Sequence, residues 1–547
     1  MEKNLGEFKT EADKIYDKRE FYRKCSAQDR SKWVDYYKAY MSVPETNNPF
    51  LANLFIPKTH EAVELLAAFL VGPNQSISAS PEGREDTAKA IVAEKLLEFQ
   101  WRKVLKAREK IITWVKQGII FGNGIMKVGW EDGNPWIEPI SLPDVYFDYY
   151  QRDIQDSEMV IHRIVKSIDE VKKDKKYNSN RKKVVAEAEE EEKDTKFNAY
   201  DTATSATDNT KVEILEVWTK EEVITTAPTG AGYTILRREK NPYDFVPFVK
   251  LRFKNNPLPN RAYDIGAIAP TINIQKAFND TINEFFDNAT LINNKMWIKR
   301  RGAAINPMDL RRRPGGVITV DDIERDLKPD EVSDIKPSLL KLLEVLDNEF
   351  QQASLVINIL KGVPGAKFAT EVAAGQANVQ QMLDIIDGNI KDALSELGQM
   401  VLEMDLKNIK KTQSIKVLDN EEEWGWIEIE PKDFSGKFDV EVKPNRNIFG
   451  SKAVKQKQLL DFLGIISGDE QITSRYPNLK MKIYKKWLEE AGFSDAAYFF
   501  EENSRETPPT ETLPQTTPTA SATPTKVNAG VGEPKEPTTF RNMAIHL

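Results

Sequence analysis

The chain has 547 residues, of which 30% are charged and 40% hydrophobic, with a formal net charge of −8 and a pI near 5.5. This length is sufficient for several hydrophobic cores. One cysteine, Cys25, and three histidines, His60, His162 and His546, exclude a disulfide framework and leave almost nothing for a zinc site or a Cys–His catalytic pair. The most apolar stretch, residues 62–71, falls well short of the roughly twenty residues of a spanning helix, and the start MEKNLGEFKT has no apolar signal core. We therefore expect a soluble, intracellular-type protein.

The first 268 residues predict a helical start followed by a mixed α/β region. Aromatic residues at helical spacing between positions 16 and 40 indicate helices packed through an aromatic face. Residues 59–71 predict a helix with Thr59 as its N-cap, and residues 90–118 predict one longer helix. Alternating apolar residues then predict strands at 125–130, 136–140 and 145–148, and several more within 212–249.

A charged insertion at residues 169–210 runs from basic to acidic and then to small polar residues. This composition indicates either a solvated helix pair or a mobile insertion. Its basic half has the composition of a nucleic-acid patch, but the neighbouring acids neutralise that charge. A surface excursion that varies freely is therefore the favoured interpretation.

Two helices are predicted at residues 269–294 and 337–356, and the first has two distinct faces. Its apolar stripe is Phe278, Ile282, Phe285, Ala289 and Ile292. Its polar stripe is Gln275, Asn279 and Asn283, at a spacing of four. The second helix repeats the 4-3-4 pattern with Leu339, Leu343, Leu346 and Phe350. A helix with two such faces usually lies between neighbours.

The insert between these helices, residues 295–336, begins with a concentration of positive charge. Before Gly316 it holds Lys295, Lys299, Arg300, Arg301, Arg311, Arg312 and Arg313 against one acid, Asp309. A phosphate-rich polyanion would explain this cluster. A loop that binds an acidic partner protein, or is merely solvated, explains it equally well. The turn at 313–316 followed by Val317 and Thr319 predicts a strand.

The C-terminal half is predicted to contain a loop, a long helix, strands and a tail. Glycines and a proline at residues 357–375 predict a loop or kink that includes Lys361, Gly362, Pro364, Gly365 and Lys367. A near-heptad pattern predicts one helix over residues 370–409, about 60 Å long at 1.5 Å per residue. Strands up to residue 450 and helices at 451–504 follow. Residues 505–547 are rich in Pro and Thr and lack a core.

No catalytic motif is present in the sequence. It contains no phosphate-binding loop, no G-x-S-x-G and no H-E-x-x-H. The acidic pair Asp321 and Asp322 has no basic partner in a recognised motif, and His162 is more readily explained as structural. We predict no catalytic, metal-binding or cofactor-binding residue, and an enzyme with an unrecognised site is the least favoured hypothesis.

The order of these elements resembles the portal protein, or head-to-tail connector, of tailed bacteriophages. Four segments carry the resemblance: NLFIPKTHEAVELLAAFLVG at 53–72, FGNGIMKVGW at 121–130, PNRAYDIGAIAPTINIQKAFNDTINEFFDN at 259–288 and GAKFATEVAAGQ at 365–376. The similarity extends over residues 20–500, and none of these motifs is catalytic. The charged insertion at 169–210 has no counterpart in the family pattern that we can match.

The resemblance implies an α+β portal fold. Residues 1–268 would form N-terminal helices and a mixed α/β wing, and helices 269–294 and 337–356 would form a two-helix stem. Residues 295–336 would form a small α/β clip with a basic docking cluster, and 357–375 a tunnel loop facing DNA. Residues 370–450 would supply the long kinked wing helix and further wing strands, 451–504 a short helical crown, and 505–547 a disordered tail.

The resemblance also implies a structural role in the virion. Portal subunits form a ring, typically a dodecamer, at one capsid vertex, and the ring is the channel for DNA packaging and ejection. The implied partners are further copies of the chain, the major capsid protein, the terminase large subunit, a head-to-tail adaptor and double-stranded DNA that passes non-specifically. Assembly would take place in the host cytoplasm. The alternative is another structural virion protein, such as a tail adaptor or a capsid protein, although an adaptor is usually shorter.

Overall fold

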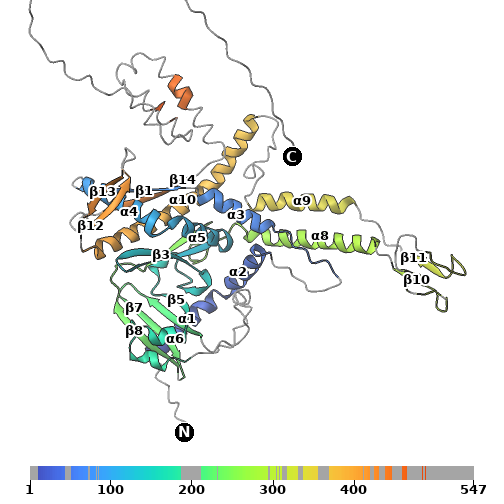
Figure 1. Ribbon diagram of the computed structural model, residues 1–547, viewed down its shortest axis with the longest axis horizontal. Coiled ribbons are helices and arrows are strands. Elements are labelled where there is room, and N and C mark those ends of the chain that lie inside the picture. The colour runs from blue at the N-terminus through green and yellow to red at the C-terminus, as the bar shows by residue number, and fades with distance from the viewer. Residues whose placement is uncertain are drawn as a thin grey trace, which may run out of the picture. The chain divides into compact units, whose positions relative to one another are not determined.

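The computed structural model describes most of the chain up to residue 445 and little beyond it (Figure 1). The described residues are 10–42, 51–71, 74–81, 83, 86–185, 211–230, 232–293, 296–303, 305–306, 308, 310, 317–329, 337–354, 369–410, 412–418, 424–429, 438–445, 459–464, 483–484 and 487. The chain divides into two compact units, Met1–Ile483 and Tyr484–Leu547. The fold described below belongs to the first unit.

Two of the three N-terminal helices pack against the fifth helix. The three are α1 (Glu11–Cys25), α2 (Ala27–Tyr40) and α3 (Lys58–Val71), and α2 and α3 both contact α5 (Ala107–Phe121). The predicted aromatic packing is present, because Trp33 of α2 is buried and meets Phe121 edge-on. The prediction that Thr59 caps α3 is wrong. Thr59 lies inside the helix, fully buried, and its hydroxyl donates to Gln275 at 3.3 Å.

The single helix predicted over residues 90–118 is interrupted. The structure has α4 (Thr87–Phe99), a π-helical turn η2 (Gln100–Val104) and α5. Lys106 stands between them with φ +47°, a left-handed conformation that ends one helix and starts the next. The break allows Trp101 and Leu105 to be buried, which periodicity alone does not reveal.

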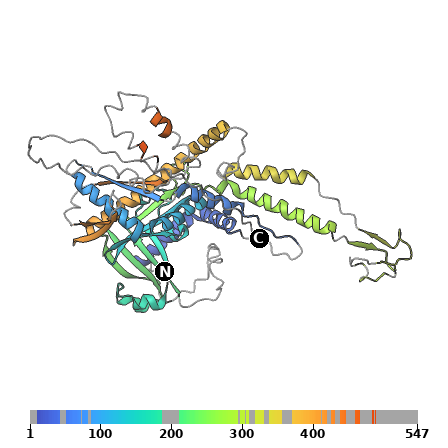
Figure 2. The ribbon, with the colours of Figure 1, turned by 45° about the horizontal axis from the view of Figure 1, so that its top comes forward.

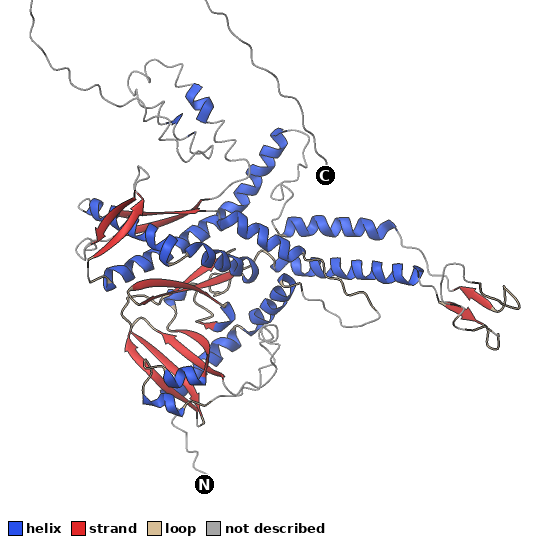
Figure 3. Ribbon diagram, viewed as in Figure 1, coloured by secondary structure: helices blue, strands red, loops and turns tan. Residues whose placement is uncertain are grey.

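The predicted strands of the N-terminal half form two antiparallel sheets (Figure 3). The first has the order β3-β2-β9, with β2 (Asn123–Glu131), β3 (Asn134–Ile140) and β9 (Phe248–Arg252). The second has the order β4-β5-β6-β7-β8. Its strands are β4 (Val145–Tyr146), β5 (Val160–Ser167), β6 (Lys211–Trp218), β7 (Glu222–Thr229) and β8 (Gly232–Lys240). The strands predicted at 125–130, 136–140 and within 212–249 are confirmed, and the one at 145–148 is two residues long.

The first part of the charged insertion is anchored in the protein. It contains α6 (Ile168–Lys173) and the 3-10 turn η5 (Ser179–Lys183). Val171 and Val184 are buried in a small core with residues of β6, β7 and β8. A freely variable surface excursion is therefore the wrong description for residues 168–185, because two valines among many charges dock the segment. Residues 186–210 lie outside the described part.

A long helix and its neighbouring strands complete the first unit. The helix predicted at 370–409 is confirmed as α10 (Ala369–Asn408), which packs on β9 and on β14 (Phe438–Asn445). Strand β14 pairs antiparallel with β1 (Asn74–Pro81), so that Ile77 lies opposite Val442. Strand β12 (Gln413–Leu418) pairs with β13 (Trp424–Ile429). The polar sequence of β1, NQSISASP, gave no strand signal.

The two helices with 4-3-4 spacing are confirmed as α8 (Ile272–Asn293) and α9 (Pro337–Ala353), which lie side by side (Figures 1 and 2). Between them, β10 (Trp297–Lys299) pairs with β11 (Leu327–Pro329). The strand predicted at Val317 and Thr319 is wrong, since that stretch is irregular and Val317 is 76% exposed. The strand that pairs with residues 297–299 is β11, which begins ten residues after Val317.

Most of the remaining predictions concern residues outside the described part. They are residues 357–368 of the loop predicted at 357–375, most of the helices at 451–504, and the tail at 505–547. The rest of the loop prediction is wrong, because residues 369–375 belong to the start of α10 and the helix continues through Gly375. Residues 459–464 are helical, as predicted for that region.

Candidate functional site

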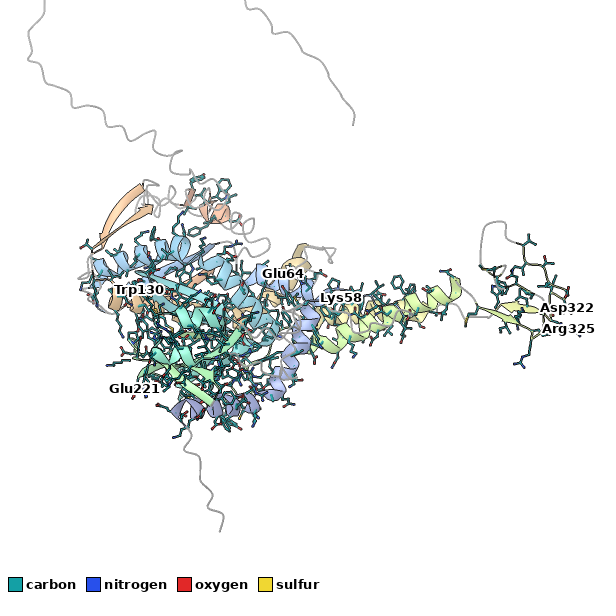
Figure 4. The ribbon with its side chains drawn as sticks, turned by 60° about the horizontal axis from the view of Figure 1, so that its bottom comes forward. Lys58, Glu64, Trp130, Glu221, Asp322 and Arg325 are labelled. Atoms are coloured by element: carbon teal, nitrogen blue, oxygen red, sulfur yellow. The ribbon has the colours of Figure 1, made fainter. Side chains whose placement is uncertain are left out.

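The helix pair is attached to the protein through the start of α3. Lys58 forms an ion pair with Asp347 of α9. The same ammonium lies 4.3 Å from the ring centroid of Phe278 of α8, a cation–π geometry. Figure 4 shows Lys58 where α3 meets the helix pair. One side chain of α3 therefore contacts both helices, and sequence reasoning gave it no role.

The polar stripe of α8 binds an extended segment of the same chain. We call residues 52–57, which precede α3, the strap. Asn283 forms two hydrogen bonds with the backbone of Leu54: its Oδ1 accepts from the N–H at 2.8 Å and its Nδ2 donates to the carbonyl at 3.1 Å. Asn279 Oδ1 accepts from the N–H of Ile56 at 3.0 Å.

The ladder of hydrogen bonds continues in both directions along α8. At one end Gln275 Nε2 donates to the carbonyl of Ile56 at 2.9 Å, while its Oε1 accepts from the N–H of Thr59 at 3.2 Å. At the other end Asp287 Oδ1 accepts from the N–H of Ala52 at 2.6 Å. The structure thus brings together the three predicted stem residues and adds Asp287, which continues the same spacing of four.

The hydrogen bonds can repeat along α8 because the spacing of every fourth residue on a helix nearly equals the spacing of every second residue in an extended chain. Four residues of an α-helix rise about 6.0 Å, and two residues of an extended chain rise about 6.6 Å. Alternate backbone groups of the strap therefore meet every fourth side chain of α8. Within the strap all of these contacts are to main-chain atoms, and the side chain of Leu54 remains about half exposed. The polar stripe of α8 was predicted to face a neighbouring element, and that neighbour is the strap of the same chain.

The predicted basic cluster is partly used inside the insert. Lys299 Nζ donates to the carbonyl of Ile305 at 2.7 Å, and Arg300 Nη2 lies 2.7 Å from Oδ1 of Asp326. The side chain of Asp326 is almost fully buried, and it also accepts from the N–H of Asp322 at 3.1 Å. Arg301 is exposed.

Counting the whole insert changes the electrostatic interpretation. Residues 295–336 contain ten Lys and Arg and eight Asp and Glu, a net charge of +2. The β10–β11 pairing brings Arg300 of the basic half against Asp326 of the acidic half. The sequence feature that could have predicted this pairing is the acidic second half of the insert, which a charge count that ends at Gly316 omits. Figure 4 labels Asp322 and Arg325 in that half.

Eight of the predicted site residues lie outside the described part of the chain. They are the five residues of the predicted tunnel loop and three arginines of the insert: Lys361, Gly362, Pro364, Gly365, Lys367, Arg311, Arg312 and Arg313.

The helix pair is acidic and retains exposed apolar side chains. Each of α8 and α9 has one lysine against three acids. On α9 the side chains of Leu340, Leu342 and Val345 are exposed, and on α8 those of Phe286 and Leu291.

The described residues contain no cluster of three or more His, Cys, Asp or Glu side chains arranged to hold a metal ion. Among the helices of that part of the chain, none has the length and apolar character needed to cross a bilayer.

An α+β protein with a helix pair, a small paired insert between its helices and a long helix after it has the elements expected of a phage portal protein. Residues 131–528 match the model of the phage SU10 portal protein family. This match covers 398 of the 547 residues, and the chain belongs to that family. The family is structural, and its members are components of the capsid vertex of a phage. No curated protein matches the chain.

Proposed function

We propose that the chain is one subunit of a closed portal ring, expected to have twelve copies, through which the phage genome is packaged and ejected. The observation that carries this proposal is the family match over residues 131–528. The helix pair supports it, because a head-to-tail ring requires two different faces on each subunit. Here one side of α8 is covered by the strap, whereas α9 exposes Leu342 and Val345.

In this proposal α8 and α9 are the stem and residues 295–336 are the clip, which docks the terminase large subunit during packaging and a head-to-tail adaptor afterwards. The sheets and α10 are the wing, which faces the major capsid protein, and residues 451–504 are the crown. The net charge of −8 suits a channel that must let DNA slide without gripping it.

Negative-stain microscopy of the purified chain tests the ring, with the mass of the particle measured in parallel. We expect annular particles with a central hole. A protein that stays monomeric at all concentrations tested would contradict the proposal. Labelling of intact virions separates the alternatives, because a portal marks one vertex inside the head, a capsid protein marks every face and a tail adaptor marks the tail side only.

We propose in addition that residues 357–368, the part of the predicted loop that precedes α10, are a tunnel loop facing DNA. Lys361 and Lys367 are its cations, next to the breakers Gly362, Pro364 and Gly365. The double variant Lys361→Glu/Lys367→Glu should form normal rings but retain less DNA in filled heads, with the larger deficit at low salt. Retention equal to the wild type at every salt concentration would contradict a contact between this loop and DNA.

A further inference from the structure

Asp405 is a carboxyl group sealed between the last turns of α10 and the π-helical turn η2. Its residue is 0% exposed. Its Oδ1 accepts a hydrogen bond from Gln100 Nε2 at 2.8 Å. Gln100 is the first residue of η2 and is itself buried. A single hydrogen bond from a neutral amide is far too little to keep a carboxylate ionised in such a place.

Two buried oxygens of this pair lack partners. They are Oδ2 of Asp405 and Oε1 of Gln100. Both atoms are acceptors when the carboxyl group is ionised, so they cannot satisfy each other. A proton on Oδ2 removes the conflict, because a carboxylic acid donates where the amide oxygen accepts.

We propose that Asp405 is a carboxylic acid in the folded protein, that Oδ2–H donates to Oε1 of Gln100, and that this reciprocal acid–amide pair is a pH-sensitive lock between α10 and η2. When the pH rises, the Asp405 carboxylic acid releases one proton to solvent and becomes a carboxylate. That buried carboxylate then faces an amide oxygen. This inference is independent of the proposed function.

The surroundings of the pair are apolar or already neutralised. Leu96 and Ile409, with Val92, Phe99, Trp130 and Leu406 around them, form an apolar cluster on the same turns of α4 and α10. Figure 4 labels Trp130 of this cluster. Burial raises the pKa of Asp405 to about 7, and the hydrogen bond from Gln100 opposes that rise only in part.

Charged groups on the neighbouring elements are engaged elsewhere or exposed. On α4, Lys95 pairs with Glu98 at 3.2 Å. On α10, Lys407 pairs with Asp244 at 2.8 Å, and Glu403 accepts from Gln399 at 3.4 Å. Arg102 and Lys103 of η2 and Glu138 of β3 are exposed. None of them contributes to the pKa shift of Asp405.

The sign of the pH effect follows from linkage. The folded-state pKa of Asp405, about 7, lies above the ordinary value near 3.9. Between these two pKa values Asp405 is protonated in the folded protein but ionised when this region is open. The stabilisation that the proton provides at acid pH is therefore lost as pH rises through 7. Between pH 5 and pH 9 the equilibrium constant for opening of this region should increase about 100-fold.

The test compares the wild-type chain with Asp405→Asn by hydrogen exchange in peptides that cover residues 96–105 and 400–409. Asparagine is nearly isosteric and reproduces both hydrogen bonds at every pH, as an amide–amide pair. At each pH the ratio of wild-type to variant exchange cancels the intrinsic base catalysis and the effect of other titrating groups. We expect this ratio to rise about 100-fold from pH 5 to pH 9. A ratio that is constant with pH would overturn the lock.

A second measurement does not depend on stability. The infrared difference spectrum between wild type and Asp405→Asn at pH 5 should contain the carbonyl stretch of a protonated carboxylic acid, which disappears by pH 9. Carboxylate bands at both pH values would show an ionised Asp405 and overturn the proposal. If Asp405→Asn does not fold, Asp405→Ala provides the same difference spectrum, since it also removes the Asp405 carboxyl group.

Discussion

Gly122 stands at the turn from α5 into β2 with φ +93°, a backbone conformation that side chains with a Cβ rarely adopt. A Cβ at this position would also collide with the carbonyl oxygen of Asp264. That carbonyl belongs to the loop before α8, so the glycine permits close approach of two backbone segments. Gly122 of the motif FGNGIMKVGW therefore has a packing role.

Gly122→Ala should lower the free energy of unfolding by more than about 2 kcal/mol, because backbone strain and a steric clash act together. Gly133 is the matched control. It also has a positive φ, +81°, but a Cβ there would meet nothing within 4 Å. Gly133→Ala should cost only the strain, about 1 kcal/mol. Chemical denaturation of both variants measures the difference, and equal losses would contradict the role assigned to the Asp264 carbonyl.

Lys127 joins the two N-terminal sheets through a buried ion pair. Its Nζ on β2 lies 2.9 Å from Oε2 of Glu216 on β6, and both side chains are largely buried. The neighbouring His162 on β5 is within 3.4 Å of the ammonium. Burial and the positive charge of Lys127 lower the pKa of His162 to about 3, so this imidazole is neutral. The structure supports the interpretation of His162 as a structural residue.

Lys127→Met should destabilise the protein by about 3–5 kcal/mol, since it leaves Glu216 charged, buried and unpaired. The double variant Lys127→Met/Glu216→Gln should recover most of that loss, because no buried charge remains. Urea denaturation of the wild type and the two variants checks this. A double variant no more stable than the single one would show that packing of the lysine stem, rather than its charge, holds the sheets together.

At the scale of elements, the ladder on α8 fixes where the polypeptide enters α3. The strap is bound by hydrogen bonds to its backbone, while Leu54 stays exposed. Such binding depends on side chains of α8 and not on the side chains of the strap. The strap should therefore tolerate substitution, whereas Asn279 and Asn283 should not.

Asn283→Ala should weaken strap binding by about 1–3 kcal/mol, because it removes two hydrogen bonds and leaves the Leu54 backbone with none from this helix. Amide hydrogen exchange of residues 52–57 should accelerate accordingly. Glu284→Ala is the control, since the next residue of α8 is exposed. Equal exchange in Asn283→Ala and the wild type would mean that other contacts hold the strap.

At the scale of the whole molecule, the basic cluster of the insert includes residues with partners inside the insert and an exposed arginine. Lys299 and Arg300 of the basic cluster have partners within the insert, whereas Arg301 is exposed. Residues 311–313 supply three further arginines within a segment whose net charge is +2. Exposed arginines add little to stability, but they strongly influence partner choice and association rate.

The triple variant Arg311→Ser/Arg312→Ser/Arg313→Ser should fold and assemble like the wild type but impair docking of the packaging motor or the adaptor. Packaged DNA and attached tails, counted in particles made with the variant, measure the effect. Arg300→Ser is the contrasting variant, because it breaks the pair with the buried Asp326 and should destabilise the insert itself. Normal packaging and tail attachment by the triple variant would contradict a docking role.

The sequence alone determined the local and periodic features. The apolar stripes of α8, α9 and α10 repeat at helical spacing, so each helix can be predicted from its own residues. Strands β3 and β6 show a largely alternating burial pattern, whereas β2 and β7 are buried along most of their length. The polar stripe of α8 was also visible, because four-residue spacing is a local property.

Only the tertiary structure decided what those features contact. Strand β1 forms by pairing with β14, more than 350 residues away, and its own polar sequence carries no strand pattern. The partner of Gln275, Asn279 and Asn283 is the backbone of the strap, and backbone groups leave no mark on a sequence. Gln100, where the predicted helix over 90–118 is interrupted, likewise donates a hydrogen bond to Asp405, which is 305 positions away. Sequence specifies which groups are available, and long-range packing specifies which of them meet, because burial energy depends on neighbours that local periodicity does not encode.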